Sequence, residues 1–95
     1  MKVLVIEDEP HLRESIQTYL EQQGFVCEAV ADFRAGMEKV RLYAYDCVVV
    51  DIGLPFGSGL DIVRELKELE ARAGIIIISA KASLEDKLTG LELGS

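Results

Sequence analysis

Short apolar runs alternate with amphipathic stretches along the whole sequence. The runs at 3–6, 25–30, 45–50 and 75–78 are rich in β-branched residues and have the length of strands. Between and after them, apolar residues recur every three or four positions at 12–20, 33–40, 60–69 and 84–93, as in helices that cover a sheet. The pattern predicts four strands and four helices in strict alternation.

Local signals predict where the helices begin and end. Pro10 suits a first helical turn, and Asp32 and Ser83 are typical N-caps. Gly24 follows the first helix at the position where a left-handed residue often ends a helix, and Gly74 is expected to close the third helix in the same way.

Strands joined by helical crossovers run parallel, and the crossovers are right-handed. The third run is apolar on both faces after Asp46, so helices should cover both sides of the sheet. The second run is more polar, which favours an edge position. The sequence therefore predicts a doubly wound parallel α/β sheet, whose ligand site lies beyond the carboxyl ends of the strands.

Charge and composition narrow the possible partners. Ten Lys and Arg residues against seventeen Asp and Glu residues give a net charge of −7, which argues against direct binding to nucleic acid or to an anionic membrane. The apolar runs are far shorter than a membrane span. Glu7 interrupts the first run, unlike in a signal peptide, so we expect a cytoplasmic protein.

Polar residues follow three of the predicted strands. Glu7 and Asp8 follow the first, Asp51 the third and Ser79 the fourth. The first loop has neither glycine nor a basic residue with which to bind a phosphate directly, but clustered carboxylates are the ligands that Mg²⁺ prefers. A carboxylate neutralised by a metal can act as a nucleophile toward a phosphoryl group. A solvated acidic rim is the alternative, and convergence from different strands favours a site.

Three segments together resemble the receiver domain of two-component response regulators, in the branch that carries a winged-helix DNA-binding domain. They are Val-Ile-Glu-Asp-Glu at 5–9, Asp-Ile-Gly-Leu-Pro at 51–55 with Gly59, and Ser-Ala-Lys at 79–81. The resemblance implies a flavodoxin-like sheet of strand order 2-1-3-4. It also implies a signalling switch, rather than an enzyme, that regulates transcription through a downstream domain.

The resemblance implies a role for each strand-end residue. Asp51 would accept a phosphoryl group from a sensor histidine kinase. Asp8 and Glu7 would hold Mg²⁺ together with Asp51 and the backbone carbonyl of Gly53. Ser79 would contact the phosphoryl oxygens and report phosphorylation by moving toward them.

The resemblance to the family is incomplete at the C-terminal end of the sequence. The family fold has a fifth strand, which ends in a lysine that pairs with the phosphoryl group, and a fifth helix. We therefore expect residues 1–95 to be an incomplete receiver domain lacking that strand and helix. The run 75–78 would then be an open apolar edge through which the chain associates with itself or another chain. The alternative function is an interaction module that is not phosphorylated productively.

A phosphatase of the haloacid dehalogenase type is a further alternative, but it needs a carboxylate two residues after the nucleophile, where this sequence has Gly53.

Several other residues have structural interpretations. Cys27 and Cys47 should pack as small apolar residues that the first strand keeps apart. The remaining expectations place His11 and Phe56 at the surface, the latter beside Asp51, and three aromatic residues in or beside the core: Phe33, Tyr43 and Tyr45.

Overall fold

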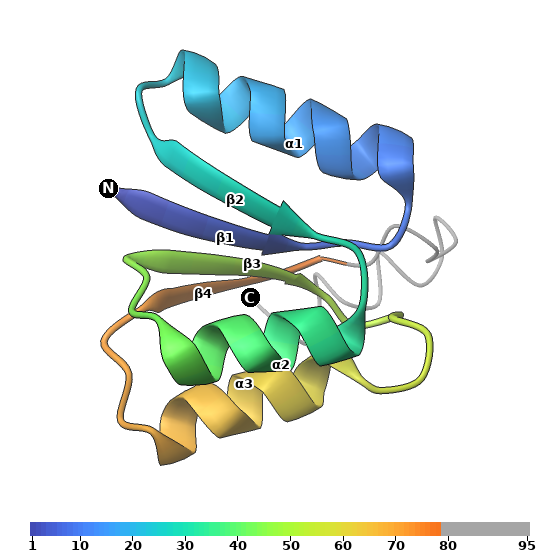
Figure 1. Ribbon diagram of the computed structural model, residues 1–95, viewed down its shortest axis with the longest axis vertical. Helices are drawn as coiled ribbons and strands as arrows, with labels where there is room; N and C mark the ends of the chain where they lie inside the picture. The colour runs from blue at the N-terminus through green and yellow to red at the C-terminus, as the bar shows by residue number, and fades with distance from the viewer. Residues whose placement is uncertain (79–95) are drawn as a thin grey trace, which may run out of the picture.

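The computed structural model describes residues 1–78 of the chain, which form a parallel sheet with helices on both faces (Figure 1). The strands are β1 (Lys2–Ile6), β2 (Val26–Val30), β3 (Cys47–Asp51) and β4 (Gly74–Ile78), and the helices are α1 (Pro10–Gln22), α2 (Phe33–Leu42) and α3 (Gly59–Glu68). The strand order is β2-β1-β3-β4 and every pairing is parallel. This confirms the predicted doubly wound sheet and the edge position of the second strand. The fourth helix predicted at 84–93, with its cap at Ser83, lies outside the described residues.

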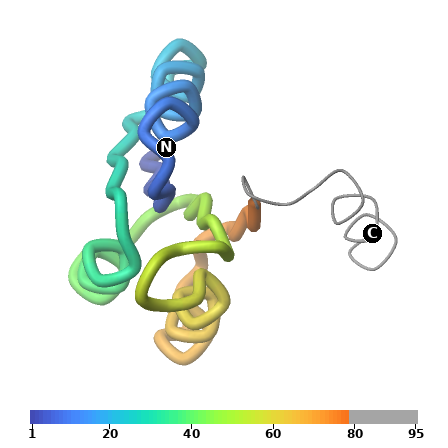
Figure 2. Tube along the Cα trace, turned by 90° about the vertical axis from the view of Figure 1, so that its right-hand side faces the viewer, coloured from blue at the N-terminus to red at the C-terminus, as the bar shows by residue number. Residues whose placement is uncertain are grey.

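The helices lie in two layers, α1 on one side of the sheet and the neighbouring α2 and α3 on the other, as the turned view in Figure 2 also shows. The alternation of side chains along the strands explains this division. On β1, Leu4 and Ile6 face α2 and α3, while Val3 and Val5 face α1. Because both sides of β1 and β3 are covered, both strands are apolar apart from Lys2 at the start of β1 and Asp51 at the end of β3.

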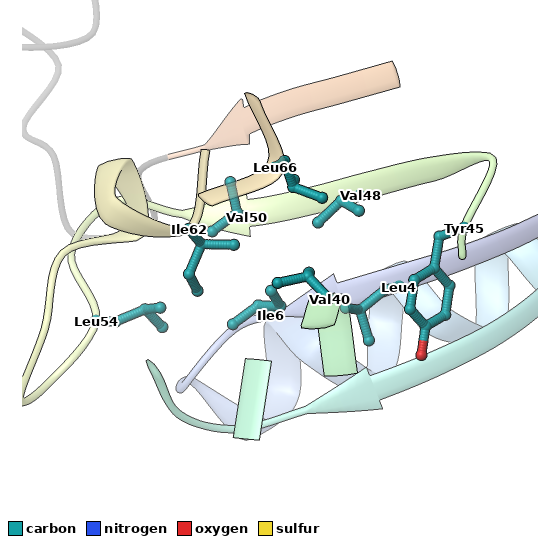
Figure 3. Close-up of a cluster of buried hydrophobic side chains, with 9 residues drawn as sticks. All are labelled: Leu4, Ile6, Val40, Tyr45, Val48, Val50, Leu54, Ile62 and Leu66. Carbon is teal, nitrogen blue, oxygen red and sulfur yellow. The ribbon is translucent and has the colours of Figure 1, made fainter. Parts of the chain in front are cut away.

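The larger core lies between the sheet and the α2–α3 pair. Figure 3 shows its nine buried residues, which come from β1, β3, both helices and the loops beside them: Leu4, Ile6, Val40, Tyr45, Val48, Val50, Leu54, Ile62 and Leu66. Helix α2 comes close to the sheet because Gly36 faces Ile6, and a β-carbon there would lie 2.8 Å from Ile6 Cδ1. The smaller core on the other side consists of Val3, Val5, Cys27 and Val49, against which Ile16 and Leu20 of α1 pack.

The N-cap predicted at Asp32 is confirmed, because its side chain accepts a hydrogen bond from the Ala35 amide at 2.7 Å. Gly24 has the predicted left-handed conformation, with φ of 90°. The prediction for Gly74 is wrong. Helix α3 ends at Glu68, the left-handed residue after it is Glu70 with φ of 54°, and Gly74 is the first residue of β4.

The predictions for the aromatic residues and cysteines are only partly confirmed. Tyr45 is buried and Phe33 packs beside the larger core, but Tyr43 is half-exposed because it follows α2 at the rim of the sheet. Cys27 and Cys47 are free thiols in the strands on either side of β1, and both are in register with Val3. The intervening strand keeps the sulfurs apart, as expected.

Candidate functional site

The chain continues from β1 directly into Glu7, whose side chain is completely buried. Its amide donates a hydrogen bond to the carbonyl of Val30 at 3.1 Å, so pairing with β2 extends one residue beyond the strand. Its own carbonyl accepts a hydrogen bond from Arg13 Nη1 at 3.0 Å. Both polar groups of the Glu7 backbone are therefore held, which fixes where the side chain starts.

Helix α1 begins immediately after this acidic pair. Glu9 is its N-cap, and the Glu9 carboxylate accepts hydrogen bonds from the amides of His11 at 3.1 Å and Leu12 at 2.7 Å. These bonds to backbone amides lower the pKa of Glu9. Glu9 is thus committed to the helix end, whereas Glu7 and Asp8 precede it at the carboxyl end of β1. His11 is exposed, as predicted.

Asp51 is the last residue of β3, and its side chain is completely buried. Its Oδ1 accepts a hydrogen bond from the Gly53 amide at 2.8 Å, which orients the carboxylate. The start of α3 lies directly against the same residue, because a β-carbon at Gly59 would overlap the Asp51 carbonyl oxygen and lie 2.8 Å from its carbonyl carbon. Only glycine at position 59 allows this approach.

The structure brings the three predicted acidic residues together. Glu7, Asp8 and Asp51 each offer a carboxylate oxygen, and these oxygens lie within 4.8 Å of one another. Both oxygens of Glu7 and Oδ2 of Asp51 are buried without a hydrogen-bond partner among residues 1–78. Buried carboxylate oxygens in this state are costly unless a cation or proton accompanies them.

The close approach of the three carboxylates also changes the pKa of Glu7. Burial, contact with Asp51 and repulsion from Asp51 and Asp8 raise the pKa of Glu7 to about 8. An all-oxygen set of carboxylates is suited to a hard divalent cation such as Mg²⁺, which would replace the proton on Glu7. The residues present therefore fit the predicted metal.

Two of the predicted contributions are not described by this geometry. Ser79, with the Ala80 and Lys81 that follow it, lies outside the described residues. Gly53 contributes its amide to Asp51, and the metal-binding role of its carbonyl stays a prediction.

Arg13 was missed in the sequence, where it falls on the polar side of α1. Its position relative to Glu9 was the signal in the sequence that could have indicated its contact with the acidic loop. It lies one helical turn after Glu9, and helical side chains lean toward the N-terminus of their helix, which here is the acidic loop.

The loop between β3 and α3 flanks the site. Phe56 is fully exposed, as predicted, and has a left-handed backbone with φ of 60°. The next residue, Gly57, lies against the ring of Phe33 so closely that a β-carbon would overlap it. The loop after Asp51 is therefore packed onto the start of α2.

None of the helices in residues 1–78 has the length and apolar character needed to cross a bilayer.

Comparisons with known proteins agree with this geometry. The family model of the response regulator receiver domain matches residues 3–95. The chain is 42% identical to the two-component response regulator PhoP of Pseudomonas aeruginosa, over 100% of this chain and 42% of that protein. It is 36% identical to the transcriptional regulatory protein QseB of Escherichia coli O157:H7, over 100% of this chain and 43% of that protein. The chain thus spans less than half the length of these relatives.

Solved structures give the same result. The receiver domain of the Francisella response regulator 1452 superposes with a TM-score of 0.78 at 30% identity, covering 99% of this chain and 78% of that one. The response regulator TrrA of Thermotoga maritima, solved in complex with Mg²⁺–BeF, superposes with a TM-score of 0.79 at 28% identity, covering 95% and 78%. Fold, acidic cluster and family match together lead to one conclusion: the chain belongs to the response regulator receiver domain family.

Proposed function

We propose that this chain is a phosphoryl-accepting switch in which Asp51 receives the phosphoryl group from a phosphohistidine of a sensor histidine kinase. The observation that carries the proposal is the buried cluster of Glu7, Asp8 and Asp51, whose oxygens lie within 4.8 Å of one another. Receiver domains bind Mg²⁺ at an acidic pocket and interact with sensor histidine kinases, which supports this assignment.

In the proposed reaction an Asp51 carboxylate oxygen attacks the phosphorus of the donor. A phosphorus–oxygen bond forms, the phosphorus–nitrogen bond breaks, and the imidazole nitrogen keeps the electron pair of that bond. The Gly53 amide orients the attacking carboxylate at 2.8 Å. Glu7 and Asp8 would hold Mg²⁺, which supplies neutralising charge for the carboxylates and the phosphoryl oxygens. The Gly53 carbonyl and Ser79 belong to the same proposal, as further metal and phosphoryl contacts.

The output proposed for the whole protein is regulation of transcription. PhoP and QseB are named as regulators, and this chain corresponds to less than half of each. The net charge of −7 does not favour DNA binding by this segment. DNA contact would therefore come from a separate downstream domain. We also propose that the chain is not a hydrolase, because Gly53 stands where a dehalogenase-type phosphatase carries its second carboxylate.

One observation supports the alternative of an interaction module that self-associates. In β4, which is an edge of the sheet among residues 1–78, Ile76 and Ile77 are 52% and 48% exposed. An apolar edge strand can pair with another chain. Sedimentation of the 95-residue chain tests this alternative. A folded monomer at micromolar concentration would exclude it.

Phosphorylation of the purified chain with acetyl phosphate and Mg²⁺ tests the proposed function. We expect intact mass to increase by one phosphoryl group, and Asp51→Asn to abolish the increase. Asp61→Asn is the matched control, because Asp61 is an aspartate of α3 that pairs with Arg64 at the surface. Labelling that persists in Asp51→Asn, or no labelling of the wild-type chain, would contradict the proposal.

A further inference from the structure

Arg13 connects helix α1 to the acidic loop. Its amide donates a hydrogen bond to the Glu9 carbonyl at 2.9 Å, which places Arg13 in the first turn of the helix. From there its half-buried side chain reaches back past the helix end. Nη1 donates to the Glu7 carbonyl at 3.0 Å and lies 3.5 Å from the Asp8 carbonyl. One guanidinium nitrogen therefore contacts the peptides of both acidic residues.

These contacts determine where the two carboxylates can lie. The Glu7 amide is already held by Val30 of β2, and Arg13 holds the carbonyl on the other side of the same residue. The peptide that joins Glu7 to Asp8 is thereby fixed in orientation. Each side chain starts from this fixed backbone, so its carboxylate has few remaining torsions with which to leave the cluster.

The groups that accept the hydrogen bonds of Arg13 also matter for metal binding. The hydrogen bonds of the Arg13 side chain run to the carbonyl oxygens of Glu7 and Asp8, and among residues 1–78 neither carboxylate oxygen of Glu7 has a hydrogen-bond partner. A guanidinium that paired with Glu7 or Asp51 would occupy the oxygens that a cation needs. Bound to carbonyls instead, Arg13 brings a permanent positive charge to the backbone of Glu7 and Asp8 and does not occupy the carboxylate oxygens of Glu7.

We propose that Arg13 is a positioning residue of this receiver domain, which holds the Glu7–Asp8 peptide so that the acidic cluster binds a divalent cation. The inference rests on the proposed function, because the cation is the Mg²⁺ of that proposal. Residues that orient metal ligands in this way usually contribute strongly to metal affinity although they do not touch the metal.

Calorimetric titration of the full chain with Mg²⁺ tests the role of Arg13. We expect Arg13→Met, which keeps most of the side-chain length but has no donor, to raise the dissociation constant about tenfold or more. Arg13→Lys keeps a charged donor and should recover part of the affinity. Arg64→Met is the matched control, because it also removes one positive charge and, among residues 1–78, loses an exposed pair with Asp61 on α3. We expect it to change the constant by less than about twofold.

A second measurement separates failure of this inference from failure of the proposed function. Carbonyl ¹³C signals of Glu7 and Asp8 are recorded in the metal-free wild-type chain and its variants, with thermal unfolding to confirm folding. We expect both signals to shift in Arg13→Met, to return toward wild type in Arg13→Lys and to stay unchanged in Arg64→Met. If Arg13→Met does not fold, the same comparison is made with Arg13→Gln.

Two outcomes would overturn the role of Arg13. One is unchanged carbonyl signals in the folded variants, and the other is Mg²⁺ affinity equal to that of Arg64→Met. Absence of Mg²⁺ binding by the wild-type chain would instead contradict the metal in the proposed function, and the carbonyl signals would still decide whether Arg13 holds the loop.

Discussion

Gly59 lies against the backbone carbonyl of Asp51, so the first residue of α3 and the last residue of β3 are in direct contact. A β-carbon at position 59 would also lie 2.9 Å from Ile52 Cα. The neighbours on this side are backbone atoms, which cannot move as a flexible side chain can. The position of the proposed phosphoacceptor therefore depends on a residue without a side chain.

Gly59→Ala should destabilise the chain by about 1–3 kcal/mol, because α3 must move away from Asp51. Urea denaturation measures the change. Gly74→Ala is the control, since a β-carbon there meets only the Asp46 carbonyl oxygen at 3.8 Å. We expect the control to stay within about 0.5 kcal/mol of wild type. Equal losses in the two variants would refute the close contact at position 59.

Gly57 and Phe33 should show energetic coupling. Gly57→Ala alone overlaps the Phe33 ring, and Phe33→Leu alone loses packing beside the larger core. The double variant relieves the overlap, so its loss of stability should be smaller than the sum of the single losses by about 1 kcal/mol. A double-mutant cycle from chemical denaturation measures the difference. Simple additivity would mean that the loop does not pack on this ring.

Tyr45→Phe should cost about 1 kcal/mol at neutral pH, because the hydroxyl donates a 2.6 Å hydrogen bond to the Glu28 carboxylate. The same bond, helped by Lys2 and Lys39, lowers the pKa of Glu28. A carboxyl with a lowered pKa in the folded state stabilises the fold above its unfolded pKa and loses that contribution as the pH falls.

The difference between wild type and Tyr45→Phe should therefore shrink in acid, below a pH of about 4.5. Melting temperatures measured across this range test the expectation. Tyr43→Phe is the control, since Tyr43 is half-exposed. If the stability difference between wild type and Tyr45→Phe stays constant below this pH, the Tyr45 hydroxyl does not stabilise the ionised form of Glu28.

Glu7→Gln should separate metal binding from folding. The pKa of Glu7 is raised to about 8, so in the metal-free chain at pH 7 its side chain is mostly protonated, and an amide of the same shape should change stability little. The amide cannot replace an ionised metal ligand, so Mg²⁺ affinity should fall about tenfold or more.

Melting temperatures with and without Mg²⁺ test the substitution, with Glu14→Gln on the exposed side of α1 as the control. At a Mg²⁺ concentration of 100 times the dissociation constant, the wild type should gain about 2.7 kcal/mol from the metal. If Mg²⁺ stabilises the Glu7→Gln chain as much as the wild type, Glu7 is not a ligand of the metal.

The fold was predictable because its signals are redundant. Periodicity, Asp32 as a cap and Gly24 as a helix end all indicated the same alternation of elements, and parallel strands necessarily bring their carboxyl ends to one edge. The acidic cluster followed from that rule alone. The end of α3 was not predictable in the same way, because Glu70 adopts a left-handed conformation for which glycine is the usual signal.

The contacts around the cluster were predicted less well than its members. The role of Arg13 was missed, since helical periodicity shows which side of a helix a residue occupies but not how far a long side chain reaches. The exposure of Tyr43 was missed for a related reason, because apolar character does not show where a helix stops covering the sheet. Such contacts depend on the lengths and approach of elements far apart in the chain.

The charges among residues 1–78 are distributed unevenly. On β2, Glu28 is accompanied by Lys2 at 3.4 Å and Lys39 at 3.7 Å, whereas at the carboxyl edge of the sheet three carboxylates lie close together and Arg13 is bound to backbone carbonyls. Excess negative charge at one edge concentrates divalent cations from solution before any of them is bound. The same field repels a free anionic phosphodonor, so capture of the metal should precede approach of the donor, and raising the ionic strength should slow the first step and favour the second.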